Sequence, residues 1–273
     1  MVTVPASTLS HFRRFSLFNS PYAAHDRGCA IDLYPETNQG LSPVAGVVRD
    51  TRTVRAPSRS YAVAEDHLIL IDTGDHVARI LHVDPAVDAG DHVAVGDALG
   101  EMVRSGFFGP WVDNHVHLGF RDPDANPYRA AGSLPVEVDV PVCPLDWDGT
   151  GTVREVGDTY VVLDRPEHPE PGSWAGLSAA PGVVLDGGCP HYDGGGVLPA
   201  RDGPTPVSVA GGRVGVADGR AVAWDGVTLR ANGRPITGLS LFIAQDAAFG
   251  AKLVCPAHDF ASGEVIRVTV DGA

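Results

Sequence analysis

The chain has 273 residues, of which 44% are hydrophobic and 20% are charged. It can bury the core of one large or two modest domains, and this composition excludes a disordered tail protein. The 34 acidic and 20 basic residues give a net charge of −14 at pH 7, and Lys252 is the single lysine. This charge disfavours nucleic acids and anionic lipids as partners. No apolar run approaches the roughly 18 to 20 residues of a membrane helix.

The negative charge is spread evenly, because residues 1–140 and residues 141–273 each carry a net charge of −7. Carboxylates hold hydration water in strong salt, where screening weakens their mutual repulsion. The distribution therefore favours adaptation to a salty solvent over a binding patch, and it predicts a halophilic host. The N-terminus lacks the basic start and apolar core of a signal peptide, and the four cysteines are widely spaced. Both features predict a cytoplasmic location with reduced thiols.

Apolar residues in the first half come in short bursts bounded by Gly, Asp or Pro, which is typical of strands. The predicted strands are Val44–Val48, Tyr61–Ala64, His67–Asp72, Val77–Val83, Ala98–Val103 and Asn114–Arg121. Helical periodicity is hard to find anywhere, so the first half reads as an all-β sheet or sandwich. The character of the chain changes near residue 140, which predicts one domain over residues 1–140 and a smaller β-rich domain over residues 141–273.

The second half offers further short strands between Gly- and Pro-rich stretches. They are Gly151–Val156, Tyr160–Leu163, Val207–Val209, Arg213–Val216, Ala221–Trp224, Leu239–Ile243 and Val265–Val270. The interval Pro166–Pro206 holds much of the Gly and Pro and is predicted to be a long looped excursion. The overall fold class is therefore all-β.

Histidines gather in the first half, since eight of the eleven lie within residues 1–121. The strongest local pattern is Asn114-His115-Val116-His117. Side chains two apart in a strand share a face, so His115 and His117 are expected to point the same way. Two imidazoles on one side of a sheet can ligate a metal, or one can ligate while the other acts as an acid or base.

A second pattern, Gly28-Cys29-Ala30-Ile31-Asp32-Leu33-Tyr34, places a carboxylate inside an apolar run. Burying an unpaired charge costs several kcal/mol, so an ion or a cationic partner is expected opposite Asp32. An arginine such as Arg27 or Arg49 is the simpler partner. His82 ends the strand Ala78-Arg79-Ile80-Leu81, and the pattern V-x-x-G-D-x-V-x-x-G-D-x-L-G follows in residues 87–100.

These motifs, in this order, resemble the LytM and lysostaphin type zinc metallopeptidases, the M23 family, over roughly residues 22–123. The resemblance implies an antiparallel β domain with a duplicated hybrid motif and a bound zinc ion. It also implies hydrolysis of a peptide amide by metal-activated water, with peptides as substrates. Asp32 and His117 would be metal ligands, and His115 and His82 would be the catalytic pair.

The chain departs from the family at the first ligand, since position 28 is glycine. His25, Asp26 and Cys29 are the candidates to replace it, and His25 is the preferred one. A degenerate module that binds a partner without metal is the alternative function. In the second half, Cys143, Cys189-Pro190-His191 and Cys255-Pro256-Ala257-His258 match no compact zinc motif, and buried structural cysteines are the favoured interpretation.

Overall fold

The computed structural model describes residues 1–272, and at Asp26 it describes the backbone alone. Almost all of its regular structure is strand, which confirms the all-β fold class, and it has two helices of four residues each. The chain forms two compact units. The first joins Met1–Phe15 with Arg27–Val140, and the second joins Ser16–Asp26 with the chain from Pro141 onward. None of the helices in the described chain is long and apolar enough to cross a membrane.

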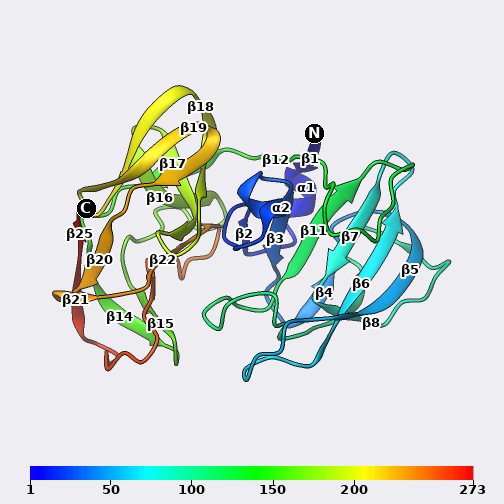
Figure 1. Cartoon of the computed structure of the whole chain (residues 1–273), viewed down its shortest axis with the longest axis horizontal. Coiled ribbons are helices and arrows are strands. Elements are labelled where there is room, and N and C mark those ends of the chain that lie inside the picture. Colours follow the sequence, from blue (N-terminus) through cyan, green and yellow to red (C-terminus); the bar gives the residue numbers. More distant parts are fainter. Residues whose placement is uncertain (273) are drawn as a thin grey trace. The chain divides into compact units, whose positions relative to one another are not determined.

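The first unit is built on one antiparallel sheet. Its strands follow the order β9-β5-β6-β7-β11-β3, and β4, β10 and β8 form a smaller antiparallel sheet. Figure 1 shows β5, β6, β7 and β11 side by side. The elements that begin in this unit are β1 (Val2–Pro5), α1 (Ala6–Leu9), β2 (Arg14–Ser16), β3 (Ala30–Tyr34), β4 (Gln39–Leu41), β5 (Gly46–Arg55), β6 (Glu65–Asp72), β7 (Val77–Leu81), β8 (Val83–Pro85), β9 (His92–Val93), β10 (Ala98–Met102), β11 (Val116–Arg121) and β12 (Val136–Asp139).

Three strand predictions in this unit need correction. Tyr61–Ala64 is not a strand: the Tyr61 hydroxyl donates to the Phe108 carbonyl and the Val63 N–H donates to the Arg104 carbonyl, without a ladder of pairs. The predicted strand Val77–Val83 is broken at His82, which has a φ of 72°. The last strand begins at Val116 rather than Asn114, so His115 lies just before it.

The second unit is a larger network of antiparallel pairs, with one parallel pair between β13 and β16. With the segment Ser16–Asp26 it holds more residues than the first unit. Its elements are α2 (Ala23–Asp26), β13 (Val142–Leu145), β14 (Thr150–Val156), β15 (Tyr160–Leu163), β16 (Trp174–Ala180), β17 (Val183–Cys189), β18 (Gly195–Val209), β19 (Gly212–Trp224), β20 (Thr228–Ala231), β21 (Arg234–Pro235), β22 (Gly238–Leu241), β23 (Ile243–Ala244), β24 (Lys252–Val254) and β25 (Val265–Asp271).

The prediction of a long loop over Pro166–Pro206 is wrong, because this interval contains β16, β17 and most of the long hairpin strand β18 (Figure 1). Two of its glycines, Gly195 and Gly196, lie in β18 where aromatic rings occupy the space of a side chain. A Cβ on Gly195 would lie 2.2 Å from the Trp224 ring, and one on Gly196 would lie 2.1 Å from the Phe18 ring. Glycine here marks close packing rather than a turn.

Asp186 on β17 anchors the segment Ser16–Asp26 within the second unit. Its side chain is fully buried and accepts hydrogen bonds from Ser16 Oγ at 2.5 Å, Leu17 N at 2.6 Å and Phe18 N at 3.2 Å. Burial raises the pKa of Asp186 to about 6, although these hydrogen bonds and the charge of His25 act in the opposite direction. The folded state therefore binds a proton more tightly than the unfolded chain does.

This shift predicts how stability depends on pH. Between about pH 4 and pH 6 the folded protein holds the Asp186 proton that the unfolded chain has released, so stability falls as pH rises through this window. The Asp186→Asn variant keeps the shape without the charge and should gain up to about 3 kcal/mol over the native chain between pH 4.5 and pH 7.5. Urea unfolding of the metal-free protein at both pH values measures the difference. An equal gain in Asp193→Asn, an exposed acid in the same region, would contradict the assignment.

Candidate metal centre

The centre of the site is a cross-strand pair between Asp32 and His117. β3 and β11 are antiparallel and place these residues directly opposite each other, so their side chains share a face of the sheet. His117 Nδ1 lies 2.9 Å from Asp32 Oδ1, and Asp32 is 2% exposed. With a proton between them the two atoms form a hydrogen bond, and without it both offer lone pairs to a metal ion.

His115 approaches the same carboxylate oxygen. Its Nδ1 lies 2.9 Å from the Asp113 carbonyl oxygen and its Nε2 lies 3.5 Å from Asp32 Oδ1. Burial lowers the pKa of His115 to about 4 against the opposing effect of the Asp32 charge, so the ring is neutral at pH 7. Because a carbonyl only accepts, Nδ1 carries the proton, and the lone pair of Nε2 faces the carboxylate. Two acceptors this close call for a cation or a proton between them.

The ring of His82 lies next to the rings of His115 and His117. Its ring centroid lies 5.0 Å from that of His115 and 5.7 Å from that of His117. Its backbone is left-handed, a conformation that costs a non-glycine residue about 1 to 2 kcal/mol. Leu81, the residue before it, pairs with His117 across the sheet. The break between β7 and β8 therefore occurs beside the metal-ligand candidates.

A buried carboxylate that the sequence did not single out fixes His82. Asp66 is fully buried, and its Oδ2 accepts from His82 Nδ1 at 2.6 Å and from Ser105 Oγ at 2.5 Å. Its Oδ1 accepts from the backbone N–H groups of His82 at 3.0 Å and His67 at 2.6 Å. Burial raises the pKa of Asp66, but these donors and the His82 charge outweigh it and lower the pKa to about 2. The ionised carboxylate only accepts, so His82 carries its proton on Nδ1 and presents Nε2 to the site.

His25 lies on α2, five residues before the start of β3, and is 1% exposed. Its Nδ1 lies 2.8 Å from the Leu17 carbonyl oxygen, so Nε2 is its candidate ligand atom. His25, Asp32 and His117 each offer one ligand atom, and these atoms lie within 4.8 Å of one another. Ligands of one zinc ion at about 2.0 to 2.2 Å stand roughly 3.3 to 3.6 Å apart. Two imidazoles and one carboxylate are a donor set that suits zinc.

The backbone explains the glycine at the position of the missing family ligand. Gly28 has a φ of 58° and follows the helical turn α2, where a left-handed residue ends the helix. Of the other two candidates, Cys29 points its thiol at the Arg27 carbonyl at 3.6 Å, and the side chain of Asp26 lies outside the described residues. The short helix α2 thus carries the preferred candidate, His25, three residues before Gly28 in the sequence.

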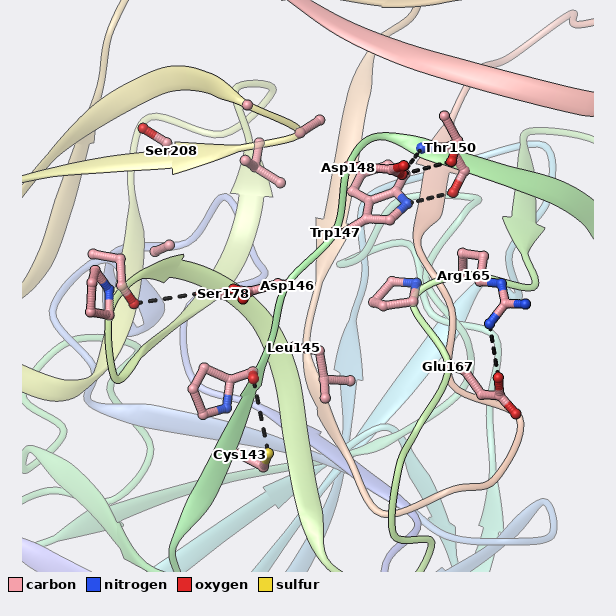
Figure 2. A pocket seen from close by; sticks show the side chains of 18 of the residues that line it. Cys143, Leu145, Asp146, Trp147, Asp148, Thr150, Arg165, Glu167, Ser178 and Ser208 are labelled. Carbon is pink, nitrogen blue, oxygen red and sulfur yellow. Dashed lines mark hydrogen bonds and ion pairs between the residues drawn. The ribbon is translucent and has the colours of Figure 1, made fainter.

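The second unit contains a cleft of about 1140 Å³ that holds none of the predicted site residues. Figure 2 shows Trp147, the exposed Cys143 and the Arg165–Glu167 ion pair in its wall. The other two Cys-Pro cysteines are buried, and burial raises the pKa of Cys189 and of Cys255 to about 12. Across the described residues, no metal-binding group forms around these cysteines.

Comparison with protein families covers nearly the whole chain. Residues 3–138 match the model described as "Domain of unknown function (DUF8155) N-terminal domain", and residues 143–271 match the corresponding C-terminal domain. The chain belongs to the DUF8155 family. A search of curated proteins finds no match. The two family domains parallel the two-domain organisation of the structure.

The left-handed backbone of His82 predicts an unusual order of stabilities. Glycine adopts this conformation without strain, so His82→Gly should be more stable than His82→Ala by about 1 kcal/mol, against the usual order in strands. Urea unfolding of both variants measures the difference. The same pair at His67, in the strand β6, is the control and should show alanine as the more stable substitution. Alanine being the better residue at both positions would refute the strain at His82.

Proposed function

We propose that this DUF8155 protein is a zinc-dependent hydrolase, with His25, Asp32 and His117 holding the metal. The observation that carries the proposal is that the buried Asp32 carboxylate lies close to histidine side chains. Nitrogen atoms of His115 and His117 both lie within 3.5 Å of its Oδ1. An acidic surface supplies many exposed carboxylates, but it does not account for one that lies in an apolar strand opposite a histidine. Zinc and imidazole–carboxylate ligands are well matched chemically.

The residues around the metal would divide the remaining work. Zinc bound at such a site supplies Lewis-acid activation of water and polarisation of a carbonyl. His82, with its Nδ1 proton held by Asp66, would exchange a proton at Nε2 with the reacting group. His115, with its Nδ1 proton held by the Asp113 carbonyl, keeps a neutral ring whose Nε2 faces the site. Both rings enter the reaction already oriented, which lowers the cost of reaching the transition state.

A peptide amide is the bond that the proposal assigns as substrate, and its support is the motif order shared with the M23 family. The cytoplasmic location and the halophilic host rest on composition and stay predictions. A second function has one observation in its favour. Glycine stands where the M23 family has its first ligand, so a binding module that works without metal is the alternative.

Metal binding separates the two functions. The native protein should bind about one zinc ion per chain, and His117→Ala should weaken binding by more than the roughly 10- to 100-fold typical of a lost supporting residue. Titration calorimetry in high salt gives the affinities, and cleavage of glycine-containing peptides gives the activity. His92→Ala is the matched control because His92 is exposed and is not one of the three ligand candidates. A native chain that binds no zinc, with its partner binding indifferent to chelator, would replace the hydrolase with the binding module.

A further inference from the structure

Two arginines lie on the same face of the sheet as the candidate metal centre. Arg79 on β7 pairs with Gly119 on β11, and Leu81 pairs with His117. Directly opposed residues share a face, and so do residues two apart in one strand. Arg79, His117 and Arg121 therefore lie on one face, which also carries Asp32 through its pairing with His117. Arg79 stands about 7 Å along the sheet from the position opposite His117.

Arg121 is held by neutral acceptors. Its guanidinium donates to the carbonyl oxygens of Phe120, Arg129 and Ala130 and to Ser133 Oγ, and the residue is 1% exposed. Burial lowers its pKa, and the Cys29 thiol is the acidic group that opposes the effect. Arg121 thus fastens the loop after β11 without a carboxylate partner among the described residues.

Arg79 has less. It is 7% exposed, its Nε is buried without a hydrogen-bond partner, and its guanidinium bonds to none of the described residues. Burial and then the charge of Arg121 lower the pKa of Arg79 to about 10, so it stays cationic at neutral pH. Two adjacent buried cations without a carboxylate are costly, and the usual remedy is an anion. Among the acidic side chains that the structure describes, none forms a hydrogen bond or ion pair with Arg79.

We propose that Arg79, backed by Arg121, is a carboxylate-binding subsite of the candidate active site. The inference rests on the proposed hydrolase function and adds the class of substrate, a short peptide with a free carboxylate near the cleaved bond. An extended peptide rises about 3.4 Å per residue, so the 7 Å offset places the carboxylate about two residues from the metal centre. The local positive charge also explains how a protein of net charge −14 receives an anionic substrate.

Binding of small peptides to the metal-free protein tests the subsite without relying on catalysis. The probes are triglycine, triglycinamide and N-acetylglycyl-aspartyl-glycinamide, titrated in a chloride-free sulfate buffer and followed by NMR, including the Arg79 Nε–H resonance. Triglycine should bind about 10- to 100-fold more tightly than triglycinamide, as expected of a charge-assisted bidentate contact. Tighter binding of the aspartyl peptide than of triglycine would assign the subsite to an acidic side chain instead of the terminal carboxylate.

Arg79→Gln should remove the preference for triglycine over triglycinamide, and Arg79→Lys should restore part of it. Arg52→Gln is the matched control, because Arg52 is already paired with Asp50 at 2.7 Å and should leave the preference unchanged. Equal binding of triglycine and triglycinamide by the native chain would overturn the subsite even if Arg79→Gln failed to fold. Saturation by the buffer sulfate that triglycine cannot displace would also overturn it, as an adventitious ion only.

The subsite and the hydrolase can fail separately. Zinc affinity of Arg79→Gln should equal that of the native chain, since Arg79 is not among the metal-ligand candidates. A native chain that distinguishes the two triglycine probes but binds no zinc would keep the subsite and remove the hydrolase. A native chain that binds zinc and cleaves peptides without regard to a carboxylate would keep the hydrolase and remove the subsite.

Discussion

The structure of the site depends on one buried charge, the Asp32 carboxylate in the middle of an apolar strand. The register of β3 against β11 places His117 opposite it, and the chain just before β11 brings His115 to the same oxygen. A shift of this register by one residue would move Asp32 and His117 to opposite faces. The apolar residues Ile31, Leu33 and Leu118 lock the register by packing on the other face, so the hydrophobic pattern of the strands also fixes the polar site.

Two other buried carboxylates show how surroundings decide the protonation of an acid. Asp66 and Asp186 are both fully buried and each accepts several hydrogen bonds. The donors to Asp66 include a histidine ring in direct contact, and its pKa falls to about 2. The donors to Asp186 are a hydroxyl and backbone amides, and burial dominates, so its pKa rises to about 6. The first acid orients a candidate catalytic ring, whereas the second fastens a chain segment.

Much of the first unit could be predicted because strands there follow hydrophobic bursts with clear punctuation. β6 and β10 lie close to their predicted bounds. Asp66 could not be found from the sequence, because its importance comes from contacts with Ser105 and His82 that only the fold creates. Arg79 was missed because strand pairing alone places it beside Leu70 and Gly119, on the face that carries His117. The strand break at His82 was also hidden, since a left-handed histidine has no signature in sequence comparable to that of glycine.

The strands of the second unit were harder to predict, because some of its glycines make room for aromatic rings instead of forming turns. In Pro166–Pro206 the absence of side chains makes room for the rings of Phe18 and Trp224, and Phe18 lies far away in the sequence. The composition alone cannot distinguish such packing from a flexible loop. The segment that carries Phe18 also shows why the domain limits differ from a single cut near residue 140. Asp186 binds the backbone of Leu17 and Phe18, which assigns Ser16–Asp26 to the second unit.

Gly28 shows how the backbone constrains the position where the M23 resemblance would place a ligand. Here Gly28 adopts a φ of 58° at the end of α2, and the helical turn before it carries a buried histidine whose Nδ1 meets the Leu17 carbonyl. A ligand held through one nitrogen in this way presents the other in a fixed direction. The short helix and the glycine therefore act together, because the glycine ends the turn that positions His25.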